Sequence, residues 1–486
     1  MSEISKIGLP VLKKYDYEEM HVLNYLSESV NVKGLGAMDT KVSQATEADM
    51  ANEFARCMLH SNFRMADSGI MVYDGRKYVS VDKDKMVRLI QLVLKLNGCG
   101  NCYVVRSAET IYKFATSMLG IKPFTPSKNI VSFRNCVVNL DDMMIMPHGE
   151  FHQSVTYIDI DYDKKAKCDR FRQFLTEVLP DEDTQKVLQE FIGCMFVDRT
   201  KIKIEKVLYL LGAGRNGKSV IMNIIAKIAG DDNISRHSLH KLLKGSTSDY
   251  NIAQADKKLV NLCNDMGNED ISGGEFKSYI SGEPLMARLP FGKPFMASNP
   301  PIVIAAMNQL PQSTDHTRGA TERPIIIPFN TYITDDMMDT SLEPKLFEEL
   351  SGIFNWIAEG RTRFIKQGGK FTKSVVVEDA KKDAKDNSNS LMRFLADNRY
   401  YPRMMEGYAY KEMTLKEFYR LYCIFVDENG GNKFSHSNCG RILSQEGYEK
   451  RRTANGQMYG FYEKPFTVEL NTEEQRMQEV QSTLPF

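Results

Sequence analysis

The chain has 486 residues, which suggests about three domains. Hydrophobic residues make up 42% of it and charged residues 26%, as in an ordinary soluble globular protein, and no apolar run approaches the roughly 20 residues of a membrane span. Lysine plus arginine equals aspartate plus glutamate at 63 each, so net charge indicates no partner, and nucleic-acid binding would need local basic patches.

The first residues, Met1 to Tyr15, are polar and lack the apolar core of a signal peptide. We therefore expect a cytoplasmic protein, in a bacterial or a host cell, with no membrane partner. Nine scattered cysteines fit reduced thiols. Cys99 and Cys102 form a C-x-x-C pair with no second pair in view, and a chance pair in a turn explains them better than a zinc or redox site.

Residues 1–85 form a first region that mixes helical periodicity with a hairpin signal. Residues 71–73 and 78–81 are predicted strands, joined through Asp74-Gly75. Residues 86–200 are predicted to form an α+β domain, with a strand-like alternation at 129–140 and two amphipathic helices before residue 197.

Residues 207–228 carry the strongest functional signal. The strand-like run Val207 to Leu211 enters a turn that fits G-x-x-x-x-G-K-[ST], and a helix-like run from Val220 to Ile228 follows. In this context Lys218 would reach the β- and γ-phosphates of a nucleoside triphosphate, which we take to be ATP, and the Ser219 hydroxyl would ligate Mg²⁺. The alternative is a glycine-rich turn with an incidental Gly-Lys-Ser. The predicted phosphate-binding residues are Gly212, Ala213, Gly214, Arg215, Asn216, Gly217, Lys218 and Ser219.

Residues 204 to about 330 alternate short apolar strands with helices, which predicts an α/β domain with a parallel sheet. One strand-like run ends in Asp265, which we predict to be the catalytic acid on the metal side, although an N-cap or turn residue would look the same. A later run, 302–306, precedes Asn308, which could hydrogen-bond a γ-phosphate or its water or serve only in a turn. Arg318 or Arg323 could act as an arginine finger towards a neighbouring subunit, or form a surface ion pair.

The remaining residues suggest a boundary and a last small unit. The polar stretch 381–390 reads as a flexible boundary or an exposed helix end, and it follows an ATPase domain predicted at 201–380. Residues 391–465 form helices that end in a two-stranded wing, and 466–486 form a tail.

Taken in order, these motifs resemble the superfamily-3 helicases, and within them the phage and plasmid primase–helicase group related to the poxvirus-type primase–helicases. The resemblance covers about residues 60–465. Two departures are Cys136, where the family usually has glycine, and Asn264-Asp265, where it usually has two acids. The matching segments are Ser132 to Leu140, Phe174-Leu175 with Leu188 to Cys194, Gly214 to Ser219, Phe276 to Glu283, Asn308 to Pro311 and Arg323 to Phe329.

The resemblance implies a fold and its nucleic-acid contacts. We expect an AAA+-type P-loop ATPase core, a primase–helicase-type N-terminal domain at 86–200, a C-terminal winged helix, and a homo-oligomeric, hexameric ring. In a channel hairpin, Arg288 and Lys293 would meet phosphates of DNA and Phe291 would pack on a sugar or base, unless this is an ordinary exposed turn with a core phenylalanine. On the wing, Arg451 and Arg452 would contact duplex backbone, unless they only form a solvated charge run.

The resulting expectation is an ATP-dependent replicative DNA helicase of a phage, plasmid or related mobile element, which translocates on single-stranded DNA and opens forked DNA. Alternatives are a non-helicase P-loop ATPase motor or DNA-remodelling factor, and a ring left inactive by Asn264. The roughly 60–90 residues before the shared region are too few for a catalytic primase domain, so a separate primase or origin-binding protein is the expected partner.

Overall fold

The computed structural model describes most of the chain between residues 47 and 463. The described residues are 47–59, 63–66, 69–96, 105–119, 123–244, 247–264, 273–290, 292–310, 321–388, 390–404, 407–429, 433–453 and 456–463. Several residues singled out from the sequence lie outside them: Asp265, Phe291, Arg318, Cys99, Cys102 and the tail 466–486.

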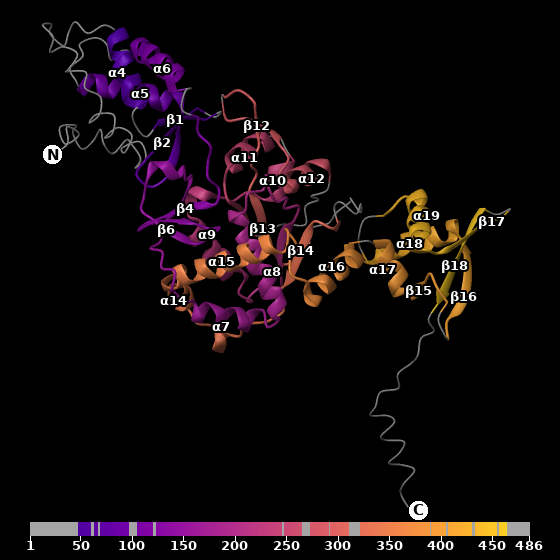
Figure 1. Cartoon of the computed structure of the whole chain (residues 1–486). Helices are drawn as coiled ribbons and strands as arrows, with labels where there is room; N and C mark the ends of the chain where they lie inside the picture. Colours follow the sequence, from indigo (N-terminus) through magenta and orange to yellow (C-terminus); the bar gives the residue numbers. More distant parts are fainter. Residues whose placement is uncertain are drawn as a thin grey trace, which may run out of the picture. The chain divides into compact units, whose positions relative to one another are not determined.

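The chain divides into two compact units (Figure 1). The larger contains most residues up to Val377, and the smaller contains Glu378 to the C-terminus with two short segments from earlier in the chain, 270–272 and 310–322. Among the described helices, none is long and apolar enough to cross a membrane.

In the N-terminal part of the larger unit, the described residues form three helices and a three-stranded antiparallel sheet that share an apolar core. The predicted hairpin is present, and the Asp74 carboxylate accepts the N–H groups of Arg76 and Lys77 at 2.8 and 2.9 Å, which fixes the turn. The elements are α4 (Glu47–Leu59), β1 (Phe63–Ala66), β2 (Gly69–Tyr73), β3 (Tyr78–Val81), α5 (Lys83–Leu96) and α6 (Val105–Leu119).

A second, mixed sheet has the order β6-β5-β4-β7, with only β4 and β7 parallel. Two amphipathic helices follow it, as the apolar spacing predicts, and both bury their apolar side in the main core. The elements are β4 (Ile130–Phe133), β5 (Val137–Asn139), β6 (Met144–Met146), β7 (Thr156–Ile158), α7 (Asp169–Val178) and α8 (Glu182–Gly193).

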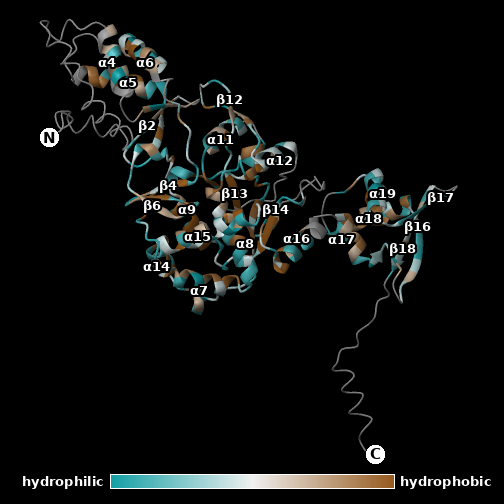
Figure 2. Cartoon of the chain, viewed as in Figure 1, coloured by the Kyte–Doolittle hydropathy of each residue, from teal (hydrophilic) through white to brown (hydrophobic). Residues whose placement is uncertain are grey.

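The centre of the larger unit is a five-stranded parallel sheet of order β14-β8-β13-β10-β9, so the expected α/β class with a parallel sheet is confirmed. All six residues of β13 are buried, because helices cover both faces of a parallel sheet, and β13 and β14 are coloured hydrophobic in Figure 2. The strands are β8 (Val207–Leu211), β9 (Ile234–Ser235), β10 (Val260–Asn264), β13 (Ile302–Met307) and β14 (Pro324–Pro328).

Helices and one hairpin complete this domain. The hairpin pairs β11 with β12 and packs against α11 through β11. The polar stretch 381–390 proves to be mostly the end of a helix, α16. The elements are α9 (Lys218–Ala229), α10 (Leu239–Leu243), α11 (Ser248–Ala255), α12 (Gly274–Ser281), β11 (Leu285–Ala287), β12 (Phe295–Ala297), α14 (Leu342–Glu348) and α15 (Leu350–Lys366). The division between the two units falls within α16 (Val375–Ser388).

Helices α8 and α15 lie unusually close. A Cβ added at Gly193 would come within 2.5 Å of the Arg361 nitrogen, and one at Gly360 would clash with the Gln189 carbonyl, so glycine permits the contact. Beside it, the fully buried Glu190 carboxylate accepts the Arg363 Nε–H at 2.6 Å. This charged pair joins the two helices inside the core.

The smaller unit has an independent core built mainly from aromatic side chains, among them Phe394, Phe418 and Phe461. Its strand β18 pairs antiparallel with β16, β17 and β15. The predicted two-stranded hairpin corresponds to β17 and β18. The elements are α17 (Ser390–Asp397), β15 (Tyr400–Tyr401), β16 (Ala409–Thr414), α18 (Leu415–Asn429), α19 (His436–Gln445), β17 (Glu449–Thr453) and β18 (Gly456–Glu463).

Candidate functional site

The glycine-rich loop connects the end of β8 to the start of α9. Gly214 and Gly217 have φ angles of 105° and 85°, in the left-handed region that glycine adopts without strain. Gly212 is required for a different reason: an added Cβ would lie 2.5 Å from the Phe329 carbonyl and would clash with the Asn216 amide. The loop therefore has the strand–turn–helix geometry that the motif predicts.

Asn216 is the internal brace of this loop. It is 3% exposed, and its Nδ2 donates to the Phe329 carbonyl at 3.0 Å, which ties the loop to the end of β14. Its Oδ1 accepts a hydrogen bond from the Lys218 ammonium at 2.9 Å. The side chain thus positions the loop and the lysine together.

The Lys218 ammonium lies within the loop and is 7% exposed. Besides Asn216, its Nζ donates to the Gly212 carbonyl at 2.7 Å. Both acceptors are neutral, and no carboxylate of the described residues forms an ion pair with it. Burial lowers the pKa of this ammonium, because the charged form is poorly solvated. A buried cation with only neutral partners is suited to receive an anion.

The other predicted phosphate-binding residues lie around this lysine. Ala213 and Ser219 are exposed, and Ser219 is the second residue of α9, where backbone N–H groups lack intrahelical partners. The Arg215 guanidinium pairs with Asp335 at 2.6 Å, and the Ile333 N–H donates to the Arg215 carbonyl at 2.8 Å. The segment after β14 therefore holds the outer side of the loop.

Two predicted polar residues belong to the same edge of the sheet. β10 ends at the exposed Asn264, which pairs in register with Ala306 of β13. Asn308 is exposed and follows Met307, whose carbonyl accepts the Gly212 N–H at 3.1 Å. Asp265, the next residue after β10, lies outside the described residues, so its role as metal ligand stays a prediction.

Arg323 immediately precedes β14, at the end of the parallel sheet opposite to the phosphate loop. Its carbonyl accepts the N–H of Val207, the first residue of β8, and its Nη2 donates to the Ser281 hydroxyl at 2.9 Å. At about 3.3 Å per residue, the five residues of β8 separate Arg323 from the loop of its own chain by about 17 Å. The backbone position is therefore incompatible with a contact to its own phosphate loop.

The predicted DNA-contacting hairpin forms an exposed structure between β10 and β13. Lys293 is exposed near its tip, whereas the Arg288 Nε donates to the Gly292 carbonyl at 3.1 Å and so braces the turn. Met286 and Met296 are cross-strand partners and are 53% and 52% exposed. Phe291 lies outside the described residues.

The basic wing residues differ in their surroundings. Both side chains are exposed, but only Arg451 pairs with a carboxylate among the described residues, that of Glu412 on β16. Because side chains alternate along a strand, Lys450 and Arg452 lie on one face of β17 and Arg451 on the other. The predicted contacts of Arg451 and Arg452 with duplex backbone stay a prediction, and the two side chains lie on different faces of the strand.

Two contacts of the phosphate loop were not predicted from the sequence. A Cβ at Gly217 would lie 2.9 Å from Val178 and 3.0 Å from Phe174, so helix α7 packs directly beneath the loop. Asp335 lies 120 residues from its partner Arg215. No local pattern could have indicated either contact, because both partners are distant in sequence.

Comparisons with known proteins match parts of this structure. Residues 99–180 match a family model described as "D5 N terminal like", and residues 210–323 match one described as a family of unknown function, DUF5906. A protein named "Putative helicase L207/L206" from Acanthamoeba polyphaga mimivirus is 26% identical over 182 residues, which are 36% of this chain and 18% of that protein.

These similarities support a phage-type primase–helicase family for this chain. The chain spans about a fifth of the length of this curated relative. Two apo structures of the NrS-1 C-terminal region are similar to this chain at 11% and 13% identity, with TM-scores of 0.44 and 0.43, and each comparison covers 84% of this chain and 98% of the other.

Proposed function

We propose that this chain is an ATP-dependent DNA helicase that acts in the replication of a phage, plasmid or related mobile element. The observation that carries the proposal is the Lys218 ammonium, buried in a glycine-rich loop at the carboxyl edge of a parallel sheet, with neutral acceptors only. Ligands of open parallel sheets bind at that edge. The similarity to a protein named as a helicase supports the proposed helicase function.

The residues of the loop fit a nucleoside triphosphate with Mg²⁺. In the proposed AAA+-type core, Lys218 would hold the β- and γ-phosphates, the loop N–H groups would bind phosphate oxygens, and Ser219 with Asp265 would hold Mg²⁺. The bound metal would neutralise charge that develops on the transferred phosphoryl group. Asn308, at the same edge, would orient the attacking water by hydrogen bonding.

Arg323 supports assembly into a ring. Since it lies about 17 Å from the loop of its own chain by strand geometry, an arginine finger at this position would have to serve the loop of a neighbouring subunit. A head-to-tail contact of this kind repeats from one copy to the next and closes into a ring, which we propose to be hexameric.

The hairpin supports the choice of DNA as the substrate. Lys293 is exposed and stands in a turn braced by Arg288, so it could contact phosphates without reading base sequence. In the proposed motor, ATP hydrolysis shifts this hairpin relative to that of the next subunit and draws single-stranded DNA through the ring.

The test is ATP hydrolysis by the purified chain with and without single-stranded DNA, with Lys218→Ala as the inactive control. We expect hydrolysis that DNA stimulates several-fold. Hydrolysis indifferent to DNA would favour a different P-loop motor, and absent hydrolysis would favour a ring that Asn264 leaves inactive.

A further inference from the structure

The candidate arginine finger Arg323 is directed towards its own subunit. Its side chain is half-buried, and its Nη2 donates to the hydroxyl of Ser281, the last residue of α12, at 2.9 Å. An arginine finger stabilises the phosphoryl group of a neighbouring subunit only when its guanidinium extends to that subunit. The hydrogen bond to Ser281 therefore favours a retracted side chain over the extended one that the proposed ring requires.

Ser281 is joined to the channel hairpin by a short, hydrogen-bonded connection. Gly282 has a φ angle of 75°, and its N–H donates to the Tyr279 carbonyl at 3.1 Å. The Glu283 N–H donates to the Ser278 carbonyl at 3.0 Å. These are the two hydrogen bonds of a Schellman motif, which ends the helix at a defined residue. Since β11 begins four residues after Ser281, a displacement of the hairpin would be passed on to the Ser281 hydroxyl.

Arg199 ties the two ends of the hairpin together. Its Nη2 donates to the Ile280 carbonyl before β11 at 2.6 Å, and its Nη1 donates to the Pro300 carbonyl after β12 at 2.8 Å. The same Nη2 donates to the Ile204 carbonyl, three residues before β8, at 2.9 Å. A Cβ added at Gly282 would lie only 3.0 Å from this nitrogen, so glycine leaves room for the guanidinium. The base of the hairpin and the end of α12 are thus braced as one unit.

We propose that the Ser281 hydroxyl is a latch that retains Arg323 in its own subunit until DNA displaces the channel hairpin. When a DNA strand moves the hairpin, the braced end of α12 moves with it and the Ser281 hydroxyl leaves the guanidinium. Arg323 then extends to the phosphate loop of the next subunit. The latch presupposes the proposed ring motor and goes beyond it, because it controls when the finger reaches its target.

The latch gives a physical reason for stimulation of hydrolysis by DNA. Without DNA, only subunits in which Arg323 has left Ser281 are competent, and the basal rate is proportional to their fraction. The net stabilisation of one hydrogen bond corresponds to about a three- to tenfold change in that fraction. DNA on the hairpin raises the fraction because it removes the acceptor from the guanidinium.

The test is ATP hydrolysis by the full chain, with and without single-stranded DNA, in the wild type and in Ser281→Ala. The substitution should raise the basal rate about three- to tenfold, towards the DNA-stimulated rate, and lower the ratio of the two rates towards 1. Ser281→Thr keeps the hydroxyl and should behave like the wild type. Damage to the fold would lower both rates, so a gain in the basal rate distinguishes the latch from a structural role.

A double variant places the latch after the DNA contact. Lys293→Ala alone should keep the low basal rate and lose its stimulation by DNA. Adding Ser281→Ala should raise the rate of this variant without DNA, because the latch is then open whether or not the hairpin is displaced.

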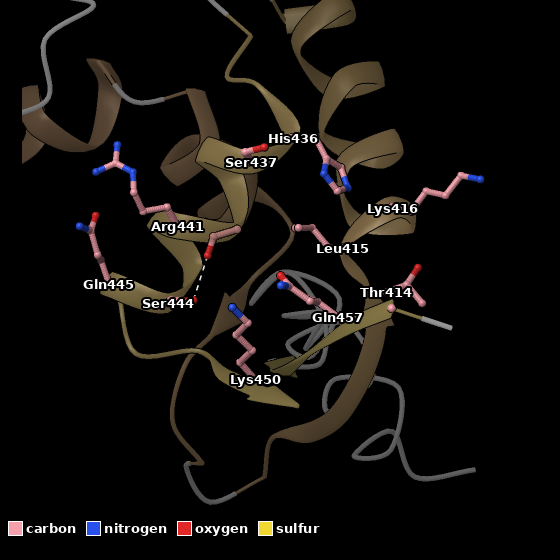
Figure 3. A pocket seen from close by; sticks show the side chains of 12 residues that line it. Thr414, Leu415, Lys416, His436, Ser437, Arg441, Ser444, Gln445, Lys450 and Gln457 are labelled. Atoms are coloured by element: carbon pink, nitrogen blue, oxygen red, sulfur yellow. Dashed lines mark hydrogen bonds between the residues drawn. The ribbon is translucent and has the colours of Figure 1, made fainter. Parts of the chain in front are cut away.

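Two serine-to-alanine controls should leave the basal rate within about 1.5-fold of the wild type. Ser278→Ala removes a half-buried hydroxyl one turn earlier in α12, which has no described contact with Arg323. Ser444→Ala removes a hydroxyl in the last turn of α19, in the smaller unit, that donates to the Gly440 carbonyl at 2.9 Å (Figure 3). It shows the effect of losing a hydroxyl hydrogen bond outside the motor.

An unchanged or lower basal rate in Ser281→Ala, a raised rate in Ser281→Thr, or an equal rise in either control would overturn the latch. If the wild type is stimulated by DNA in the same experiment, the proposed function stands without it. A wild type whose hydrolysis is indifferent to DNA would overturn the latch and the proposed function together.

Discussion

The Lys218 ammonium donates hydrogen bonds to two oxygens of the phosphate loop, the Gly212 carbonyl and the Asn216 side-chain amide. These bonds keep the side chain extended into the loop without an anion, so a phosphate would meet a positioned cation rather than a mobile one. Preorganised charge of this kind is the main source of catalytic stabilisation in phosphoryl transfer.

Lys218→Ala should lower ATP turnover by about 10²-fold or more, because the main positive charge at the transferred phosphoryl group is lost. Its melting temperature should not fall appreciably, since burial already disfavours the charged form and lowers the pKa of the lysine. Steady-state phosphate release and thermal melting measure the two effects. Lys227→Ala, on the exposed side of the same helix, is the control and should turn over ATP normally. Residual hydrolysis within about twofold of the wild type would exclude Lys218 from this role.

Helices and strands could be predicted from the sequence where neighbouring residues alone determine them. β8, the glycine turn and α9 follow from an apolar run, left-handed glycines and helical spacing within about 20 residues. β9 escaped notice because it has two residues, too few for any periodicity. The strand-like run predicted to end at Asp265 corresponds to β10, which is the third strand of the central sheet in chain order.

Residues whose role depends on pairing across elements could not be assigned from sequence. Lys450 and Arg451 are adjacent and both basic, yet only the register of β17, with Arg451 opposite Met458, shows that they face opposite sides. Arg323 could be recognised as a candidate finger, but its place at the far edge of the sheet follows only from the pairing of β14 with β8. The buried position of Glu190 could not be predicted, because the sequence of an amphipathic helix does not distinguish a buried acidic residue from an exposed one.

Glu190→Ala should lower the free energy of unfolding of the larger unit by about 3 kcal/mol, because it leaves the Arg363 guanidinium partly buried without its carboxylate. The same carboxylate accepts the N–H of Thr372 at 2.7 Å, so the loop after α15 would loosen too. Thermal melting followed by circular dichroism checks this. Glu182→Ala, exposed in the first turn of the same helix, should melt like the wild type. Equal melting of the two variants would contradict the assigned role.

Lys293→Ala should keep basal ATP hydrolysis but lose its stimulation by DNA, because the exposed ammonium near the hairpin tip is the proposed contact to phosphates. Arg288→Ala should have a smaller effect, since its side chain braces the turn through Gly292. Hydrolysis rates with and without single-stranded DNA measure both, with exposed Lys373→Ala as control. Impaired basal hydrolysis with normal stimulation would instead place Lys293 near the nucleotide.

At the scale of the whole molecule, one chain supplies two incomplete halves of the proposed active site. The loop with Lys218 lies at one edge of the central sheet and Arg323 at the other. A closed ring would bring the arginine edge of each copy to the loop edge of the next, so activity should depend on assembly.

Arg323→Ala should lower ATP turnover about 10³-fold or more, as loss of an arginine finger does. Mixing it with Lys218→Ala should restore activity, because about a quarter of the interfaces in a random ring pair an intact loop with an intact arginine. Ser281→Ala is the control, since it removes a hydrogen-bond acceptor that Arg323 has within its own chain and should stay active. If Ser281→Ala loses as much activity as Arg323→Ala and mixing restores nothing, Arg323 acts within its own subunit.

The central claim is that ATP hydrolysis at the Lys218 loop drives strand separation, and the most direct measurement is displacement of a labelled strand from forked duplex DNA by the full chain. The account predicts displacement that requires ATP and Mg²⁺ and is abolished in Lys218→Ala and in Lys293→Ala. A wild-type protein that hydrolyses ATP on this substrate yet displaces no strand would contradict it.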